Sequence, residues 1–450
     1  MTKKFSVLIK SEIKKYNKKN ITVDSDKSIT HRCLFIAAQC IGISKITGLV
    51  SEDINATING LRKLHIKILK KNGSYYVHGN GISGFKKFKG TLNFQNSATA
   101  ARSMLGCLTC FPFPVSITGD PSLKLRPFKR LTDYLEKIGA TILHPKNKKY
   151  TLPIKIHGTK DWALAQRHFL QVKSAQLASA LTYAAIQTKG VTEIIESSEV
   201  RDHTQRLLKS IKGGIAVSKN KGKRITKIRG QVEMHGFRIR VPADPSSSAF
   251  FCVQTLLSKK SSLLIKNVCV NDTRTGFIKI LKKLGGRIKI LNKKEYFGEP
   301  VADLFVQSSN LRGIKVPMKW ITSSIDDLVA CSLAFGLARG QSYFKAPEML
   351  LKETNRVKAI AELLNKLGIK AKIIKKDSLR IWGNPNIKIK SKKTIKMSSN
   401  LDHRMAMTGF VAGTLGANIL IQGFDTVKSS FPNFLKLQKQ IGAKYEIKKN

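Results

Sequence analysis

The chain reads Asp26-Lys27-Ser28 immediately before an apolar segment rich in small residues, and this helix-opening pattern recurs five more times. Ser, Asn and Asp favour helix starts because their side chains accept hydrogen bonds from unpaired backbone N–H groups. A helix start also carries partial positive charge, so it binds phosphate or carboxylate readily. The sequence therefore predicts six helices whose amino ends suit anionic ligands. The other openings are Gln95-Asn96-Ser97, Lys173-Ser174-Ala175, Asp244-Pro245-Ser246-Ser247-Ser248, Ser323-Ser324-Ile325-Asp326 and Ser398-Ser399-Asn400-Leu401-Asp402.

A second regular feature closes each repeat. A helix ends in a Leu-x-x-apolar motif, often followed by Gly, and a β-prone run comes next; Gly at this point is a signal for the end of a helix. The copies recur about every 70 to 80 residues, which is longer than common solenoid repeats. Each copy is therefore predicted to be a compact unit of two helices and several strands. The closing motifs lie at residues 61–64, 135–139, 208–211, 281–285, 364–368 and 438–442.

Length and composition limit the class of protein. A chain of 450 residues predicts two or three domains. No run approaches the roughly 18 to 20 apolar residues of a membrane span, and the first residues lack the apolar stretch of a signal peptide. Seven cysteines, most of them within apolar helices, fit reduced core residues. We therefore expect a cytoplasmic protein that does not bind a membrane.

The formal net charge of +53 raises the question of a nucleic-acid partner. The lysines are spread along the whole chain, aromatic residues are sparse, and no recognisable nucleic-acid motif interleaves the two. We therefore expect only nonspecific, charge-driven binding to nucleic acid. A positive field of this kind would steer small anionic substrates towards the protein.

Two short motifs could suggest a cofactor or a metal. Residues 79–84 match Gly-x-Gly-x-x-Gly, but residues 85–90 open no amphipathic helix, so a turn is predicted instead of a dinucleotide site. Cys107 and Cys110 have no second pair of the kind that zinc sites use. We expect neither a metal nor an organic cofactor.

Clusters of charged residues near the repeat joints are more informative. Lys27 and Arg32 lie about one helical turn apart and can face the same way, and so can Lys352 and Arg356. Any one pair could be a surface salt bridge, but the recurrence at equivalent repeat positions favours binding of an anion. Arginine suits a bidentate grip on phosphate or carboxylate. The clusters are residues 26–32, 125–127, 200–204, 352–356, 402–404 and 427–428.

Taken in order, these segments resemble the signatures of the 5-enolpyruvylshikimate-3-phosphate (EPSP) synthase family, the 3-phosphoshikimate 1-carboxyvinyltransferases. Each motif alone is moderately specific, whereas the ordered set is highly specific and covers the chain from about residue 20 to its end. The matching segments are Asp26-Lys27-Ser28-Ile29-Thr30-His31-Arg32, Asn96-Ser97-Ala98-Thr99-Ala100-Ala101-Arg102, Leu125-Arg126-Pro127, Ser174-Ala175-Gln176, Arg201-Asp202-His203-Thr204, Asp244-Pro245-Ser246-Ser247, Lys352-Glu353-Thr354-Asn355-Arg356 and Asp402-His403-Arg404.

The resemblance implies a two-domain inside-out α/β barrel with six βαβαββ repeats, three per domain. Helices would lie inside and sheets outside. The first domain would comprise residues 1–20 and 240–450, and the second residues 21–239. The active site would lie in the cleft between the domains, which closes on substrate and expels water. We expect the protein to be a monomer.

The implied reaction transfers the enolpyruvyl group of phosphoenolpyruvate to the 5-hydroxyl of shikimate 3-phosphate and releases phosphate. It proceeds by addition and elimination, and it belongs to the shikimate pathway of aromatic amino-acid biosynthesis. The hydroxyl loses a proton while the enol methylene gains one, which suits a carboxylate base and a carboxylic acid. By family motif, Asp326 would accept the hydroxyl proton and Glu353 would protonate the methylene. Lys27 would bridge both substrates and share in proton transfer.

The resemblance also implies the binding residues for the two substrates. Shikimate 3-phosphate would be held by Lys27, Ser28, Arg32, Ser174, Gln176, Ser197, Arg201, Asp326 and Lys352. Phosphoenolpyruvate would be held by Lys27, Asn96, Ala98, Arg126, Gln176, Arg356, Arg404 and Lys428. This chain departs from the family pattern at Leu350 and Asn355, where Arg and Asp are usual. We expect these changes to alter the pairing of neighbouring side chains and not the chemistry.

Two other functions remain open at this level. The sister enolpyruvyl transferase that acts on a UDP-amino sugar shares fold and chemistry, but its pocket lacks this Lys-Ser…Arg signature and its usual Cys-bearing loop is not evident here. A basic RNA-binding protein on the same scaffold would have no need for Lys27, Asp326 and Glu353 together. Phosphate release with either acceptor separates the three possibilities.

Ala98 occupies a position where the family usually has Gly. Its methyl group would protrude towards the phosphoenolpyruvate pocket, which the herbicide glyphosate occupies in the family. We predict that Ala98→Gly increases inhibition by glyphosate, as measured by inhibition curves of wild type and variant side by side. Equal sensitivity of the two proteins would refute the steric role of Ala98.

Overall fold

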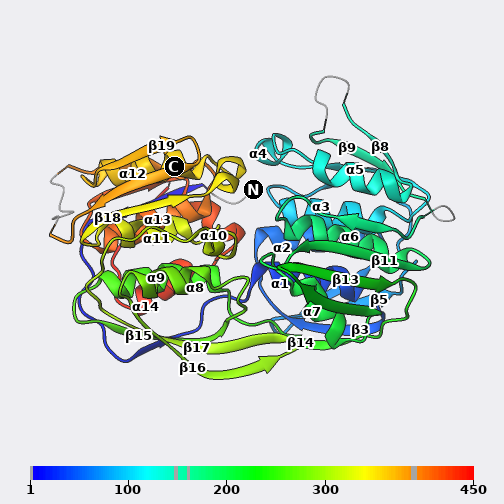
Figure 1. Ribbon diagram of the computed structural model, residues 1–450, viewed down its shortest axis with the longest axis horizontal. Coiled ribbons are helices and arrows are strands. Elements are labelled where there is room, and N and C mark those ends of the chain that lie inside the picture. Colours follow the sequence, from blue (N-terminus) through cyan, green and yellow to red (C-terminus); the bar gives the residue numbers. More distant parts are fainter. Residues whose placement is uncertain (1–3, 146–149, 160–162, 387–392, 450) are drawn as a thin grey trace. The chain divides into compact units, whose positions relative to one another are not determined.

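The computed structural model describes residues 4–145, 150–159, 163–386 and 393–449, which divide into two compact units (Figure 1). The first unit comprises the described parts of Met1–Asp24, Pro242–Glu295 and Pro300–Asn450, and the second comprises those of Ser25–Val241 and Tyr296–Glu299. These units depart from the expected domain boundaries at three places. Residues 21–24 group with the first unit, whereas residues 240–241 and 296–299 group with the second.

Three four-stranded sheets form the outer layer of the second unit, and they share one topology. In each, the first strand runs parallel to the second, and the remaining two pair antiparallel. The first sheet contains β14 (Arg238–Arg240), β3 (Ile41–Thr47), β5 (Ser74–Asn80) and β4 (Lys67–Lys71), in that order. The second contains β6 (Thr91–Asn93), β7 (Pro114–Thr118), β9 (Ile154–His157) and β8 (Thr141–Leu143). The third contains β10 (Arg167–Phe169), β11 (Val191–Ser197), β13 (Lys223–Arg229) and β12 (Ile215–Asn220).

The helices of the second unit are of two kinds. Three are buried on nearly every face, as their apolar, small-residue sequences require: α1 (Lys27–Ala38), α3 (Ala98–Leu108) and α6 (Ala175–Gln187). The other helices are only partly buried, and the rest of their surface is exposed. They are α2 (Glu52–Lys63), α4 (Pro121–Lys124), α5 (Lys129–Ile138) and α7 (His203–Ser210).

The first unit follows the same plan with three further sheets. Their orders are β16 (Arg287–Tyr296), β17 (Glu299–Gln307), β15 (Ser262–Cys269) and β2 (Lys19–Ile21); then β18 (Gly340–Lys345), β20 (Ser378–Gly383) and β19 (Ala371–Lys375); then β21 (Ile395–Ser398), β22 (Ile419–Gln422), β1 (Phe5–Ile9) and β23 (Glu446–Lys449). The central helices are α8 (Pro245–Leu257), α11 (Leu328–Gly336) and α13 (His403–Thr414), which are buried almost throughout. The remaining helices are α9 (Gly276–Lys283), α10 (Met318–Ser324), η1 (Pro347–Leu351), α12 (Arg356–Lys366), η2 (Phe424–Ser429) and α14 (Phe434–Gln440).

This arrangement confirms the predicted α/β class with helices inside and sheets outside (Figure 1). The order of strands adds a feature that the repeat pattern did not predict. Strand β2 precedes α1 in the chain but pairs with β15 of the first unit, whereas β14 precedes α8 but pairs with β3 of the second. The first strands of repeats 1 and 4 are therefore exchanged between the two units.

The predicted helix openings are correct in five of six copies. Asp26, Ser97, Ser174, Asp244 and Asp402 each cap a helix with a side-chain oxygen. The fifth opening is wrong, because Ser323 and Ser324 end α10 instead of starting a helix. The buried helix α11 begins after Asp327, which stands at the N-cap position without donating or accepting a capping hydrogen bond there.

At each predicted helix end, the residue that closes the helix has a left-handed backbone conformation, with positive φ. Gly139 has φ +119° and accepts this conformation without the clash that a Cβ would cause. Two copies lack Gly and place His65 (φ +66°) or Lys212 (φ +58°) at the equivalent point. The backbone geometry of the repeat is therefore kept even where its usual residue is absent.

No helix in the described ranges combines the length and apolar character that crossing a bilayer requires. Within those same ranges, no group of three or more His, Cys, Asp and Glu side chains is arranged to hold a metal ion. The expected absence of a cofactor stays a prediction.

Gly106 lets α3 and α6 approach closely, since a Cβ built on it would lie 2.2 Å from the carbonyl oxygen of Ala180. We predict that Gly106→Ala lowers the free energy of unfolding by roughly 1–3 kcal/mol, because overpacking outweighs the better helix propensity of Ala. Urea unfolding measures the change. Asn59→Ala, on the exposed face of α2, is the control for propensity alone. A Gly106→Ala protein as stable as wild type would contradict the packing argument.

Candidate active site

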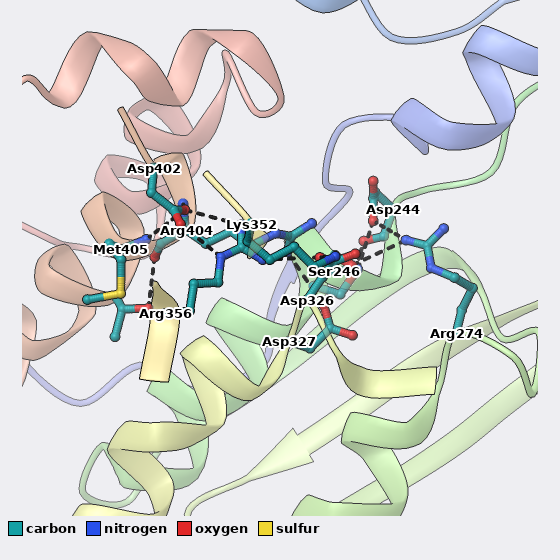
Figure 2. A network of polar contacts seen from close by, with 12 residues as sticks. Asp244, Ser246, Arg274, Asp326, Asp327, Lys352, Arg356, Asp402, Arg404 and Met405 are labelled. Carbon is teal, nitrogen blue, oxygen red and sulfur yellow. Dashed lines mark hydrogen bonds and ion pairs between the residues drawn. The ribbon is translucent and has the colours of Figure 1, made fainter. Parts of the chain in front are cut away.

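Arg356 is the centre of the charged cluster in the first unit. Its guanidinium is buried, and its Nε donates to Asp402 Oδ2 at 2.8 Å. Its Nη1 donates to Asp326 Oδ1 at 3.1 Å, and its Nη2 donates to Glu353 Oε2 at 2.6 Å and to Asp402 Oδ1 at 3.3 Å. These bonds use four of the five N–H groups of an arginine side chain. We call Asp326, Lys352, Glu353, Arg356 and Asp402 the Arg356 cluster. Figure 2 labels Asp326, Lys352, Arg356 and Asp402.

Lys352 completes this cluster from the turn that follows η1. Its Nζ donates to Asp326 Oδ1 at 3.0 Å, so one carboxylate oxygen receives bonds from two cations. Charge-assisted bonds of this kind are short and directional, and they fix the orientation of the Asp326 carboxylate. Burial alone would lower the pKa of Arg356, but the carboxylates of Asp402, Glu353 and Asp326 outweigh it and raise that pKa.

Asp402 ties the cluster to the start of α13. Its Oδ1 accepts from the backbone N–H of Arg404 at 2.9 Å and of Met405 at 3.4 Å, while its Oδ2 accepts from Thr354 Oγ1 at 3.2 Å. The same carboxylate therefore caps a helix and neutralises Arg356. The side chain of Arg404, 12% exposed, reaches the neighbouring carboxylate of Asp327 with Nη1 3.6 Å from Oδ1.

Lys428 lies against an aromatic ring of the first unit. It lies in η2, and its Nζ stands over the ring of Phe5 at 5.1 Å from the centroid. Its part in holding phosphoenolpyruvate stays a prediction.

In the second unit, Lys27 is the first residue of α1 and pairs with a carboxylate from α2. Its Nζ lies 2.7 Å from Asp53 Oδ2, with the two side chains 20% and 11% exposed. No role for Asp53 was predicted from the sequence. Its place in the first turn of a capped helix, close after the Lys27 motif, was the available signal.

A second group of polar residues gathers around α3 and α6. Arg126 Nη2 donates to Asn96 Oδ1 at 2.7 Å, and Gln176 Nε2 donates to Thr99 Oγ1 at 3.0 Å. Arg102 Nη1 donates to Gln176 Oε1. Arg102 was part of a quoted motif but had no predicted role. Burial, together with the charges of Arg126 and Arg130, lowers its pKa to about 10, so several guanidinium groups lie near one another here.

Arg32 is buried and bonded within the second unit. Its Nε donates to Thr204 Oγ1 at 2.9 Å and its Nη2 to Ser179 Oγ at 2.9 Å, while its Nη1 donates to the carbonyl of Ser28 at 2.8 Å. These bonds join α1, α6 and the start of α7. Its predicted role in binding shikimate 3-phosphate stays a prediction, because the contacts in place are structural.

The remaining predicted residues lie at the starts and ends of elements. Ala98 begins α3, and Ser174 caps α6 by accepting from the N–H of Leu177 at 3.3 Å. Ser197 ends β11, where its hydroxyl accepts from the N–H of Glu199 at 3.4 Å, and Arg201 lies in the loop between β11 and α7.

That loop is held by a buried ion pair. Arg224 Nη2 lies 2.7 Å from Glu196 Oε1, with both side chains almost fully buried. Arg224 also donates to the carbonyl of Val200 at 2.8 Å. The pair therefore fixes the backbone just before Arg201.

Comparisons with known proteins show the family of this chain. The family model "EPSP synthase (3-phosphoshikimate 1-carboxyvinyltransferase)" matches residues 12–437. The chain belongs to the EPSP synthase family. A 3-phosphoshikimate 1-carboxyvinyltransferase of Petrotoga mobilis is 40% identical over 94% of this chain and 96% of its own. That of Zymomonas mobilis subsp. mobilis is 36% identical over 95% and 94%.

Solved structures give the same result for the fold of this family member. An EPSP synthase from Acinetobacter baumannii superposes with a TM-score of 0.83 at 32% identity, covering 99% of this chain and all of the other. The enolpyruvyl transferase NikO from Streptomyces tendae, at 12% identity and a TM-score of 0.77, shares the fold.

The carboxyl of Asp327 gives a prediction for stability. Burial chiefly raises its pKa from 3.8 to about 6, against the lowering effect of Arg404. A carboxyl whose pKa is raised on folding contributes stability that is present below about pH 4 and lost as the pH rises through about 6. We predict that, between pH 5 and 7.5, wild type loses roughly 1 kcal/mol of unfolding free energy relative to Asp327→Asn.

Urea unfolding of both proteins at the two pH values measures this difference. Asp377→Asn is the control, because it removes a carboxylate from the turn between β19 and β20. It tests whether any Asp→Asn substitution changes the pH dependence of the unfolding free energy. The prediction would be contradicted if the free energies of unfolding of wild type and Asp327→Asn differed by the same amount at both pH values.

Proposed function

We propose that this chain performs its family's reaction with the residues described above. The reaction transfers the enolpyruvyl group of phosphoenolpyruvate to the 5-hydroxyl of shikimate 3-phosphate and releases phosphate. The observation that carries the proposal is the Arg356 cluster, in which four residues of the family motifs, Asp326, Lys352, Glu353 and Arg356, are joined by direct hydrogen bonds. The family match over residues 12–437 supports it.

The chemistry consists of two steps. In the addition, the hydroxyl oxygen bonds to the central carbon of phosphoenolpyruvate, the hydroxyl loses its proton, and the methylene gains one to become a methyl group. In the elimination, the methyl group loses a proton, the carbon–oxygen bond to phosphate breaks, and the double bond returns. Each step needs a base and an acid in fixed positions.

We assign the base to Asp326 and the acid to Glu353. Arg356 bonds both carboxyl groups, so the two are held by one rigid guanidinium. Lys352 adds a second bond to Asp326 and would contact shikimate 3-phosphate. Such positioning is worth much in catalysis, because reacting groups held in place need no reorganisation during the reaction.

Cations and helix starts would bind the anionic groups. Arg404 is the second residue of α13, and Arg126 donates to Asn96, which lies just before α3. Each therefore combines a guanidinium with the donors of a helix start. Lys27 stands at the start of α1 with Asp53 beside it. We propose that the clusters of the two units serve the same pair of substrates, with Lys27 sharing in proton transfer.

The setting of the enzyme is proposed on separate grounds. All seven cysteines are free thiols, and six of them are buried, which supports a reducing compartment and hence a cytoplasmic enzyme. We propose that it acts as a monomer and binds nucleic acid only through its net charge of +53. Size-exclusion chromatography and salt-dependent binding to a random RNA test these two points.

The test of the reaction is phosphate release from phosphoenolpyruvate, with shikimate 3-phosphate or the UDP-amino sugar as acceptor. Turnover with shikimate 3-phosphate alone supports the proposal. Turnover with only the UDP-sugar would place the chain with the sister transferases, and salt-dependent RNA binding without turnover would favour the RNA-binding alternative.

Asp326→Ala and Glu353→Ala should each reduce kcat by roughly 10²–10⁴-fold, the usual contribution of a general acid or base. Single-turnover rates of phosphate release measure the loss, and circular dichroism checks that the fold is kept. Glu362→Gln, an exposed change on α12, is the control. A near-normal rate in either alanine variant would remove that residue from its role.

A further inference from the structure

Asp327 is a carboxylate that the family motifs do not account for. It directly follows Asp326, stands at the N-cap of α11, and is completely buried. Neither of its oxygens accepts a hydrogen bond that meets ordinary geometric limits from any other described residue. Buried carboxylates normally have such partners, and each exception calls for an explanation.

The ion pair of Asp327 is with Arg404, whose Nη1 lies 3.6 Å from Oδ1. This distance is longer than a hydrogen bond, so the pair has a Coulomb attraction without a directional bond. Arg404 is also the residue of α13 assigned to phosphoenolpyruvate. The inference therefore rests on the proposed function.

Charged and titratable groups face Asp327 from each element around it. Arg274, in the loop before α9, lies close enough to attract its charge, and the hydroxyl of Ser246 on α8 lies nearby. Arg274 is already engaged, since its Nη2 donates to Asp244 Oδ1 at 3.0 Å and to Ser246 Oγ at 3.2 Å. The carboxylate of Asp326, the preceding residue, repels the charge of Asp327. The thiols of Cys252 on α8 and Cys331 on α11 also interact with it, and burial raises the pKa of both.

The ion pairs around Asp327 contain one more carboxylate than cation. Among the described residues of the first unit, the carboxylates of Asp326, Asp327, Glu353 and Asp402 form ion pairs with Lys352, Arg356 and Arg404. The Arg274–Asp244 pair adds no net charge (Figure 2). These seven side chains therefore carry one excess negative charge when all four carboxyl groups are ionised.

When Arg404 turns its charge to the substrate, Asp327 loses its main partner. An ionised carboxylate left buried without a counter-ion costs several kcal/mol, and such a group takes up a proton instead. One proton on Asp327 gives the group equal numbers of positive and negative charges. We propose that Asp327 is a positioning residue that holds Arg404 in the ligand-free protein and takes up a proton from solvent when Arg404 binds phosphoenolpyruvate.

The titration of Asp327 supports this assignment. Its pKa of about 6, raised mainly by burial, means that the group is largely ionised in the free protein near neutral pH and requires little work to protonate. The ionised form competes with the substrate for Arg404, and this competition strengthens as the pH rises.

The test compares the KM for phosphoenolpyruvate of wild type and Asp327→Asn at pH values from about 5.5 to 7.5. The ratio of the two KM values cancels the titration of the substrate and of all other groups. The KM of wild type divided by that of Asp327→Asn should rise on the order of tenfold from pH 5.5 to 7.5. The corresponding ratio of kcat values should change less. A merely structural role would change KM by the same factor at every pH. A ratio that stays constant would overturn the proposal.

Wild-type protein alone provides a second measurement if Asp327→Asn does not fold. Calorimetric titration with phosphoenolpyruvate, without shikimate 3-phosphate so that no turnover occurs, is done in two buffers of different ionisation enthalpy and gives the number of protons exchanged near pH 7. Uptake of most of one proton is expected. Release of protons, or none exchanged, would overturn the proposal.

Two controls separate this result from the proposed function. Asp377→Asn, outside the cluster, should retain the wild-type KM at each pH. Wild-type phosphate release with shikimate 3-phosphate is measured first. No turnover would reject the proposed function, whereas turnover with a constant KM ratio would reject only the role of Asp327.

Discussion

The burial of six helices on almost every face is the constraint on which the rest of this structure depends. A helix such as α8 or α11 has no polar side to turn towards water, so its sequence is almost wholly apolar or small. Polar and charged side chains can then be placed only near its ends, where unpaired backbone groups also need partners. Asp244 and Asp402 meet both needs, since each caps a helix and pairs with an arginine. The same rule gathers ionisable groups at the starts of buried helices.

Gathering charges in this way creates the chemistry of the first unit. Arg356 is enclosed by three carboxylates, and a buried guanidinium would be costly without them. The same carboxylates are thereby fixed in position, which is what proton transfer at two sites of a substrate requires. In the proposed mechanism, one set of bonds serves both structural pairing and catalytic placement. Asp327 remains outside this set and pairs with Arg404 instead, which is the basis of its proposed response to a ligand.

Much of this organisation was predictable from local patterns. Capping residues and closing motifs located five of the six buried helices and the left-handed residue after the outer ones. The fifth opening failed because Ser323 and Ser324 are equally suited to the end of a short helix, and α10 lies directly before the turn at Asp326. The exchange of β2 and β14 was not visible, since three-residue strands carry almost no pattern of their own.

The sequence by itself determined the repeat, the class of fold and the identity of the motif residues, because helix capping and apolar periodicity are local properties. Only the tertiary structure decided which charges neutralise one another. In the folded chain, Lys27 pairs with Asp53 and Asp327 pairs with Arg404. Arg356 forms ion pairs with three carboxylates, those of Asp326, Glu353 and Asp402. Ion pairs depend on distances between elements far apart in the chain and on the water that packing removes, and neither is encoded in a local pattern.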